Sequence, residues 1–214
     1  MQFRLYLLNV SELEDDDLRQ KALSLMDSYR RGKVNKYKIK KDRLHQIATG
    51  LLLQIGLLEL EIPGHTVGEV YLCEAGEIVR ILEDRVPIEA VYVQQQNGKP
   101  YWQQEFLQKL PFNKKFPFFS ISHSGDYAAL AIADVEMGLD IQMERPTRFK
   151  GGCQEFSRME AYVKCTGDGY AKGYTKYKEL NGDMPNYEFC SINLLPDYVI
   201  YLCHKQDHNN KSIG

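Results

Sequence analysis

Residues 119–142, FSISHSGDYAALAIADVEMGLDIQ, constrain the fold more than any other segment of the chain. Their apolar runs predict strands at residues 118–121 and 127–133, and the turn DVEMG leads into a third strand around residues 139–141. We therefore expect a hairpin followed directly by a further strand. Such a unit is a rigid support on which a few polar side chains can be placed accurately.

Polar residues interrupt this apolar segment where a strand normally hides its side chains. The motif SHSG, residues 122–125, follows the first strand, and Asp140 lies inside the third. Because side chains alternate across a strand, Asp140 faces away from Leu139 and Ile141. Asp140 is then either a solvent-facing residue or a hard oxygen ligand for Mg²⁺, and Gln142 offers a neutral oxygen on the same face.

The SHSG motif has a plain explanation as a turn, and a lone histidine such as His123 is more often structural than catalytic. The chain contains no G-x-S-x-G nucleophile motif and no phosphate loop of the G-x-x-x-x-G-K type. GDGYAKG at residues 167–173 is rich in glycine, but it follows a predicted helix rather than a strand. That order disfavours a dinucleotide site.

Glu160 and Lys164 lie four residues apart in a short predicted helix at residues 156–164, which ends at CTGDG. They therefore share one helix face and could form an ordinary ion pair worth ~0.2–0.5 kcal/mol. Alternatively, Glu160 closes a capping box that begins at Ser157. Lys99, in the turn NGKP, is an exposed lysine unless a ligand engages it.

The rest of the chain mixes helices and strands without βαβ regularity. A first strand, MQFRLYLLNV, precedes a helix capped by Ser11 that runs to about residue 31, and a second helix at residues 38–61 stops at Pro63-Gly64. Between residues 67 and 93 the runs GEVYLC, EIVRIL and EAVYVQQ predict short strands, and DYVIYLC predicts another at residues 197–203. This pattern predicts the α+β class.

The chain has 214 residues, enough for one compact unit or two small domains. No apolar run is long enough for a membrane span or a signal peptide, so we expect a cytoplasmic protein. The five cysteines form no C-x-x-C pair and predict free thiols. The polar tail HKQDHNNKSIG, residues 204–214, predicts disorder.

The charge distribution is more informative than the formal net charge of −2, which disfavours a nucleic-acid binder. Eight basic residues and one acid lie within residues 30–43; the basic residues are Arg30, Arg31, Lys33, Lys36, Lys38, Lys40, Lys41 and Arg43. Such a run is commonly a solvated helix face. On a nearly neutral protein it also predicts a small polyanionic ligand or an acidic protein partner.

Taken together and in order, NGKP, FSISHSGDY, GLDIQ and FSRMEAYVKCTGDG resemble the 4′-phosphopantetheinyl transferase family, in particular the larger type that activates peptide and polyketide synthetases. The resemblance is densest over residues 97–169 and extends more weakly to KKDRLHQIATGLLLQ and DYVIYLC. It implies two similar α+β halves packed as a pseudo-dimer, here residues 1–135 and 136–214, with coenzyme A in the cleft.

The family transfers the phosphopantetheine arm of coenzyme A to a serine of an acyl or peptidyl carrier protein and releases 3′,5′-ADP. The resemblance implies that Asp140 and Glu160, with Gln142 beside them, hold Mg²⁺ or Mn²⁺ on the pyrophosphate. It implies that Glu160 is also the base for the carrier serine, and that Lys164 stabilises or protonates the leaving phosphate.

The resemblance further implies a coenzyme A site on the N-terminal half. Lys99, Ser122 and His123 would bind phosphates through charge-assisted hydrogen bonds, and Arg30 and Lys33 stand where the family places cations for the 3′-phosphate. Because a pseudo-dimeric chain has no evident need to self-associate, the expected protein is a monomer. Nucleic acid and membranes are not among its expected partners.

The chain departs from the family pattern in two places. Gln142 stands where the family usually has a second acid, in G-[IV]-D-[IV]-E, so that a water can replace a ligand there. The connector at residues 143–155 is shorter than usual, and in the family this stretch helps to form the carrier-protein contact surface. These departures leave an alternative hypothesis, a non-catalytic coenzyme A-binding relative, and a third, an α+β interaction domain whose motifs are coincidental.

Overall fold

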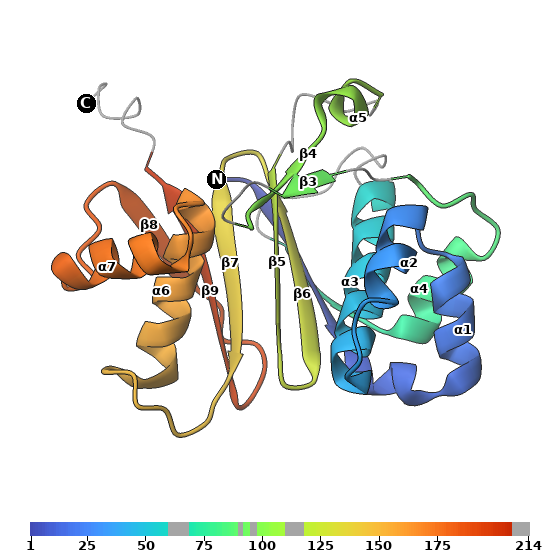
Figure 1. Ribbon diagram of the computed structural model, residues 1–214, viewed down its shortest axis with the longest axis horizontal. Helices are drawn as coiled ribbons and strands as arrows, with labels where there is room; N and C mark the ends of the chain where they lie inside the picture. Colours follow the sequence, from blue (N-terminus) through green and yellow to red (C-terminus); the bar gives the residue numbers. More distant parts are fainter. Residues whose placement is uncertain (60–68, 90–91, 95–97, 110–117, 207–214) are drawn as a thin grey trace.

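The computed structural model describes residues 1–59, 69–89, 92–94, 98–109 and 118–206. Most helices gather at two ends of the molecule and strands fill the middle, with the short helix at residues 104–109 above the strands (Figure 1). This mixed arrangement of several sheets with flanking helices confirms the predicted α+β class. Among the described residues, no helix has the length and the apolar composition that crossing a bilayer requires.

The first sheet contains the predicted N-terminal strand and the predicted hairpin. Its order is β2-β1-β6-β5, with β1 parallel to β2 and antiparallel to β6, and β5 antiparallel to β6. The bounds are β1 (Phe3–Asn9), β2 (Glu69–Cys73), β5 (Phe118–Ser124) and β6 (Tyr127–Ala133). Strand β2 confirms the prediction made from GEVYLC.

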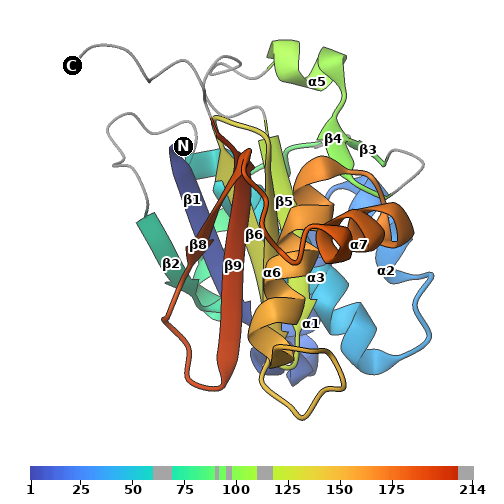
Figure 2. The ribbon, with the colours of Figure 1, turned by 90° about the vertical axis from the view of Figure 1, so that its left-hand side faces the viewer.

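The second sheet has the order β7-β9-β8, and α6 and α7 cover one of its faces (Figure 2). The bounds are β7 (Met137–Met143), β8 (Tyr187–Ser191), β9 (Tyr198–Lys205), α6 (Gly152–Thr166) and α7 (Tyr170–Glu179). Strands β7 and β9 confirm two predictions, whereas α7 and β8 were not predicted. The predicted disordered tail is wrong at its start, because His204 and Lys205 belong to β9 and His204 lies 3.3 Å from Glu188.

Three alternate serines of β5 join the two sheets. The backbone N–H groups of Leu139, Ile141 and Met143 on β7 donate to Ser120 Oγ, Ser122 Oγ and Ser124 Oγ at 3.0, 3.2 and 3.0 Å. The two facing edges are therefore linked through hydroxyls instead of carbonyls. This linkage explains why the first strand of the hairpin carries polar residues at every second position.

The hydrophobic core is continuous across the junction between the sheets. One buried cluster combines residues of β1 and β6 with residues of β7 and β9: Leu5, Leu7, Ala129, Ala131, Ala133, Met137, Leu139, Ile141, Ile200 and Leu202. The opposite face of β1, with Tyr6 and Leu8, packs on the N-terminal helices in a separate cluster. The proposed boundary near residue 135 falls between β6 and β7, and the two sides share a core there.

The N-terminal helices differ from the prediction of one long helix after Ser11. The segment forms η1 (Val10–Glu14), α1 (Asp16–Ser24) and α2 (Ser28–Val34), because Asn9, Asp15 and Asp27 each accept a backbone N–H and begin a new helix. The long helix α3 (Lys40–Glu59) confirms the second predicted helix over its described residues. Its predicted end and the stop at Pro63-Gly64 lie outside the described residues.

The run EIVRIL, predicted as a strand, lies in helix α4 (Ala75–Leu82). Ala75, Ile78, Val79 and Leu82 are all buried, and their spacing is the helical three-to-four-residue repeat rather than alternation.

Strand β3 (Tyr92–Gln94) pairs with β4 (Pro100–Trp102), which α5 (Gln104–Lys109) follows. The remainder of EAVYVQQ and the first residue of NGKP lie mostly outside the described part of the chain. The five cysteines are free thiols, as predicted.

Candidate functional site

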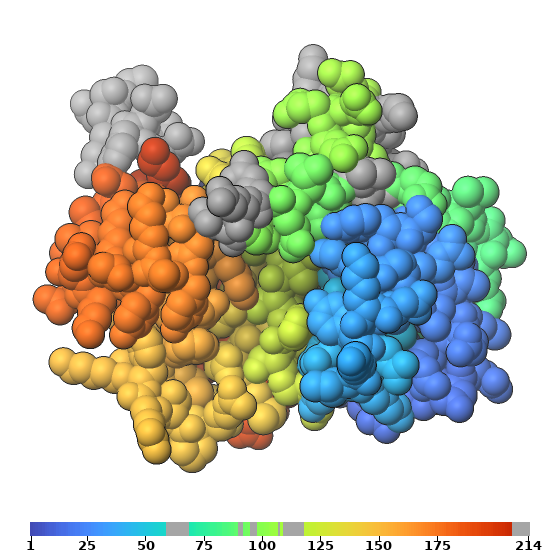
Figure 3. All heavy atoms as spheres, viewed as in Figure 1, coloured from blue at the N-terminus to red at the C-terminus, as the bar shows by residue number. Residues whose placement is uncertain are grey.

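A cavity of about 470 Å³ lies where the N-terminal helices, the hairpin and helix α6 meet. Figure 3 shows a hollow on this face, between the orange C-terminal helices and the blue N-terminal ones. Eight of the nine predicted site residues line the cavity: Arg30, Lys33, Ser122, His123, Asp140, Gln142, Glu160 and Lys164. The fold therefore joins segments that are far apart in the sequence. The exception is Lys99.

Asp140 is at the centre of a compact hydrogen-bonded group. Lys164 Nζ donates to Asp140 Oδ1 at 2.6 Å and to Ser122 Oγ at 2.8 Å, and Ser122 Oγ donates to Asp140 Oδ1 at 2.9 Å. Only 5% of Asp140 is exposed, so its interpretation as a solvent-facing strand residue is wrong. With Ile141 N–H also bonded to it, Ser122 orients the carboxylate and the ammonium relative to each other.

Glu160 lies on α6, one turn before Lys164, and faces the same cavity. Its interpretation as a capping-box residue is wrong, because α6 begins at Gly152 and Ser157 is buried inside the helix. The expected Glu160–Lys164 ion pair is also not formed, since the described ion pair of Lys164 is with Asp140. Burial raises the pKa of Glu160, the nearby Lys164 ammonium lowers it, and Asp140 raises it further, with a net upward shift.

The oxygen atoms around Asp140 fit a hard divalent cation. Asp140 Oδ2 is buried without a hydrogen-bond partner in the described part of the chain, and Glu160 and Gln142 line the same cavity. Carboxylate and amide oxygens suit Mg²⁺ or Mn²⁺, and Mg²⁺ commonly uses one or two carboxylates together with substrate phosphates and waters. Within the described ranges, no three His, Cys, Asp or Glu side chains form a metal-binding group, so any cation here would depend on two carboxylates and further oxygen ligands.

The opposite wall of the cavity is cationic. Arg30 is 2% exposed, and its Nη1 donates to Gln46 Oε1 at 2.8 Å. Its Nε is buried and has no hydrogen-bond partner among the residues that the structure describes. Burial lowers the pKa of Lys33 to about 8, and the positive charges of Arg30 and Lys36 contribute to that shift. An anion beside Arg30 and Lys33 would supply the missing hydrogen-bond acceptor and relieve this repulsion.

Tyr92 is the neutral surface beside these two cations. The Arg30 guanidinium and the Lys33 ammonium lie 5.4 and 5.2 Å from the centre of its ring, within the range of cation–π contacts. Tyr92 is 3% exposed, and burial raises the pKa of its hydroxyl to about 12. The hydroxyl accepts a hydrogen bond from Lys33 Nζ at 3.4 Å, but it stays neutral and so brings no negative charge to either cation.

His123 stacks on His45, with ring centroids 4.4 Å apart and an angle of 14° between the planes. His45 Nε2 lies 3.2 Å from the Gly125 carbonyl oxygen, to which it must donate. The His45 Nδ1 atom is therefore an acceptor, and it is buried with no donor from any described residue. Burial lowers the pKa of His123 to about 4, with smaller contributions from His45 and Lys164. The ring is therefore neutral near pH 7 and can still donate one N–H to a ligand.

Lys99 does not line the cavity, although its neighbours Gly98 and Pro100 do. Its interpretation as an exposed lysine is wrong, because only 8% of the residue is exposed. Its ammonium forms an ion pair with Glu136 at 2.8 Å and donates to the Cys165 carbonyl. The structure thus gives no support to a contact between Lys99 and a coenzyme A phosphate.

Several lining or supporting residues were not predicted from the sequence. His45, Gln46 and Thr49 lie on α3, and Tyr92 lies on β3. A signal was present for the first three, since polar residues interrupt the otherwise apolar face of α3 and are all buried. Tyr92 had no such signal, because its role depends on where a short strand packs.

Neither the comparison with protein-family models nor the comparison with curated proteins finds a match to this chain.

Proposed function

We propose that this protein transfers the 4′-phosphopantetheine arm of coenzyme A to a serine of an acyl or peptidyl carrier protein, releasing 3′,5′-ADP. The observation that carries the proposal is that one cavity has two distinct ends. Arg30 and Lys33 form a cationic end, and Asp140, Glu160 and Lys164 form a carboxylate–lysine end. Coenzyme A has matching parts, a 3′-phosphate and a pyrophosphate, separated by a ribose.

The binding roles follow from the charged and polar side chains that line the cavity. The 3′-phosphate would accept from Arg30 and Lys33, whose side chains line the cavity and donate to the neutral oxygens of Gln46 and Tyr92. His123, whose neutral ring is shielded on one face by His45 but is accessible from the cavity, would donate one N–H to the same part of the nucleotide. Ser122 is engaged by Asp140, Lys164 and the backbone of β7, so its main role would be to orient these groups.

The transfer step needs a base, a nucleophile and a stabilised leaving group. The carrier serine oxygen attacks the phosphorus of the pyrophosphate that bears the pantetheine arm, and the bond from that phosphorus to the bridging oxygen breaks. Glu160 accepts the serine proton, directly or through a water, and its raised pKa suits this role. Lys164 uses two of its three N–H groups on Asp140 and Ser122, and the third can donate to the leaving 3′,5′-ADP phosphate.

The residues that would hold the divalent cation are Asp140, through its unpartnered Oδ2, and Glu160, with Gln142 or a water completing the set. When bound, Mg²⁺ or Mn²⁺ would neutralise pyrophosphate charge and polarise the phosphorus under attack. Because Lys164 already neutralises part of the charge of Asp140, one ammonium and two carboxylates would surround the reacting phosphates.

We further propose the wider organisation that the sequence resemblance implies. The two sheets with their covering helices would be the two halves of a pseudo-dimer, residues 1–135 and 136–214, and the protein would act as a cytoplasmic monomer. Carrier domains are typically acidic around the modified serine. The basic run at residues 30–43 would therefore serve the carrier through its exposed members, such as Lys38, and the nucleotide through Arg30 and Lys33.

The experiment is the intact mass of several apo carrier domains after incubation with the full chain, coenzyme A and Mg²⁺. A gain of one phosphopantetheine group on any carrier supports the proposal, and Glu160→Gln is the matched inactive control. Coenzyme A binding by calorimetry without transfer to any carrier would identify the non-catalytic alternative, for which Gln142 and the short connector are the motivating features. Absence of both binding and transfer would refute both hypotheses.

A further inference from the structure

Lys99 lies beside the cavity, but its side chain points into the protein interior. Gly98 and Pro100 on either side of it line the cavity, whereas the lysine side chain runs into the protein and is almost fully buried. Its ammonium donates to Glu136 Oε1 at 2.8 Å and to the backbone carbonyl of Cys165. The wall of the cavity is in this way connected to two other segments.

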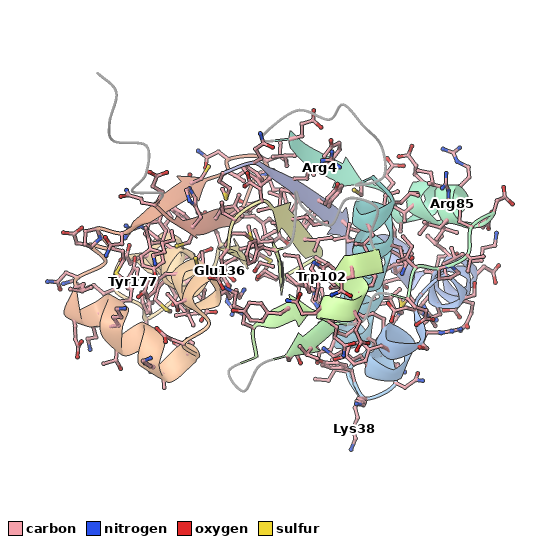
Figure 4. The ribbon with its side chains drawn as sticks, turned by 90° about the horizontal axis from the view of Figure 1, so that it is seen from above. Arg4, Lys38, Arg85, Trp102, Glu136 and Tyr177 are labelled. Carbon is pink, nitrogen blue, oxygen red and sulfur yellow. The ribbon has the colours of Figure 1, made fainter. Side chains whose placement is uncertain are left out.

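Those two segments carry the groups proposed for catalysis. Cys165 follows Lys164 in the last turn of α6, and Glu136 immediately precedes β7, the strand of Asp140. Figure 4 shows Glu136 between the C-terminal helices and the green segment that holds β3 and β4. The Lys99 ammonium thus joins the end of α6 to the start of β7. Glu160 and Lys164 on α6 must lie close to Asp140 on β7 for the proposed transfer.

The contacts around this ammonium are directional. Tyr101 OH donates to the same Glu136 oxygen at 2.9 Å, and the Tyr101 ring centre lies 5.3 Å from Lys99 Nζ. A cation at the C-terminal end of a helix interacts favourably with the partial negative charge of its carbonyl groups. Without Lys99, the Cys165 carbonyl would lose a charged donor in a buried position, which favours displacement of the last turn of α6.

We infer that Lys99 is a positioning residue for the proposed transfer, which fixes Glu160 and Lys164 relative to Asp140, instead of being a phosphate ligand. The inference depends on the proposed function for its kinetic part. It predicts that Lys99 acts on the rate of transfer and leaves the affinity for coenzyme A nearly unchanged. A phosphate ligand would show the opposite pattern.

The test compares Lys99→Met with the wild type and with Lys172→Met, a control lysine that is exposed and paired with Asp168 on the protein surface. Coenzyme A affinity is measured by calorimetry, and transfer by the mass of the carrier domain. We expect kcat to fall about tenfold or more in Lys99→Met, since small displacements of reacting groups cost up to about a hundredfold. Weakened coenzyme A binding with an unchanged kcat would overturn the inference.

A double substitution tests whether Lys99 acts through the end of α6. Adding Lys99→Met to Lys164→Met should lower kcat by clearly less than it does in the wild-type background, because effects of residues that act as a unit are not additive. Two independent, multiplying losses would overturn the inference. Transfer by the wild type alone tests the proposed function, whereas the variants test the positioning role of Lys99. Failure of the proposed function is therefore distinguishable from failure of this inference.

Hydrogen exchange gives a result that needs no activity. Amides in the last turn of α6 should exchange faster in Lys99→Met than in Lys172→Met, and unchanged exchange there would contradict the positioning role. If Lys99→Met does not fold, Glu136→Gln replaces it, since the Glu136 side chain is 47% exposed and the substitution keeps its size. The same pattern, with faster exchange and nearly unchanged coenzyme A affinity, is expected from this variant.

Discussion

Lys164 Nζ lies 2.6 Å from Asp140 Oδ1, and this ion pair replaces the Glu160–Lys164 pair expected from helix spacing. The consequence is a division of roles. Glu160 is left without an ion-pair partner among the described residues, beside a buried Asp140 oxygen that also lacks a hydrogen bond. The site therefore has one carboxylate that is held in place and one that is available.

Asp140→Ala should weaken the dependence of the transfer rate on Mg²⁺ and lower the rate itself, because it removes the unpartnered oxygen proposed as a cation ligand. The loss of folding stability should be modest, since the Lys164 side chain is 29% exposed and its ammonium can reach solvent. Rates across a Mg²⁺ titration, with urea unfolding in parallel, check both parts. An unchanged Mg²⁺ titration would remove Asp140 from the metal site.

Glu160→Gln should abolish transfer while the protein remains folded, because the amide keeps the size of the side chain but cannot accept the serine proton. Glu179→Gln, at the exposed end of α7, is the matched control and should retain full activity. Carrier mass and far-ultraviolet circular dichroism are the measurements. If Glu160→Gln kept full activity, the roles of base and metal ligand would both be wrong.

Lys33→Met should lower the affinity for coenzyme A about tenfold, the size of one charge-assisted hydrogen bond of roughly 1.5 kcal/mol, but leave that for dephospho-coenzyme A unchanged. The reason is that only the former carries the 3′-phosphate assigned to this end of the cavity. Lys38, whose side chain projects away from the body of the protein, provides the control Lys38→Met (Figure 4). Calorimetry with both ligands measures the two affinities. An equal loss of affinity for coenzyme A and dephospho-coenzyme A would show that Lys33 does not bind the 3′-phosphate.

Gly138→Ala should destabilise the protein by roughly 1–3 kcal/mol or more, as other overpacking substitutions do. A Cβ at residue 138 would overlap the Ala161 carbonyl oxygen and the Cys165 backbone nitrogen, so α6 could not approach β7 as closely. Gly76→Ala, in helix α4, adds a methyl group that meets no atom of the described residues within 4 Å, and it should be neutral or stabilising by up to about 1 kcal/mol. Urea denaturation measures both, and equal effects would show that the close approach is unimportant.

Acid should destabilise the protein through the stacked histidines. The pKa of His123 falls from its ordinary value of about 6.5 to about 4 in the folded state, and that of His45 is also lowered, mainly by burial. Between pH 6.5 and 4 the unfolded chain therefore binds more protons than the folded protein. The stability that comes from the neutral histidines is complete above about pH 6.5 and is lost as the pH falls. Unfolding free energies at pH 7 and pH 5 should differ less in His123→Asn than in the wild type. An equal difference would contradict the assignment.

The periodicity of the sequence was enough to predict the strands β1, β5, β6, β7 and β9, the helix α3 and the α+β class. It also predicted that Asp140 faces away from its neighbours, and that Glu160 and Lys164 share a helix face. These are local properties, because backbone geometry alone sets the direction of each side chain within an element. Together with the motifs, they were sufficient to name eight residues that line one cavity, out of nine expected there.

Only the tertiary structure decided which groups these side chains contact. Lys164 pairs with Asp140 across 24 residues of sequence, Ser122 bonds Lys164 across 42, and Lys99 bonds Cys165 across 66. Lys164 pairs with Asp140 instead of Glu160, and the Lys99 side chain points into the interior instead of the cavity. Both outcomes depend on how helix α6 packs on β7. The physical reason is that periodicity specifies the face of an element, whereas the partner across that face is set by the packing of distant segments.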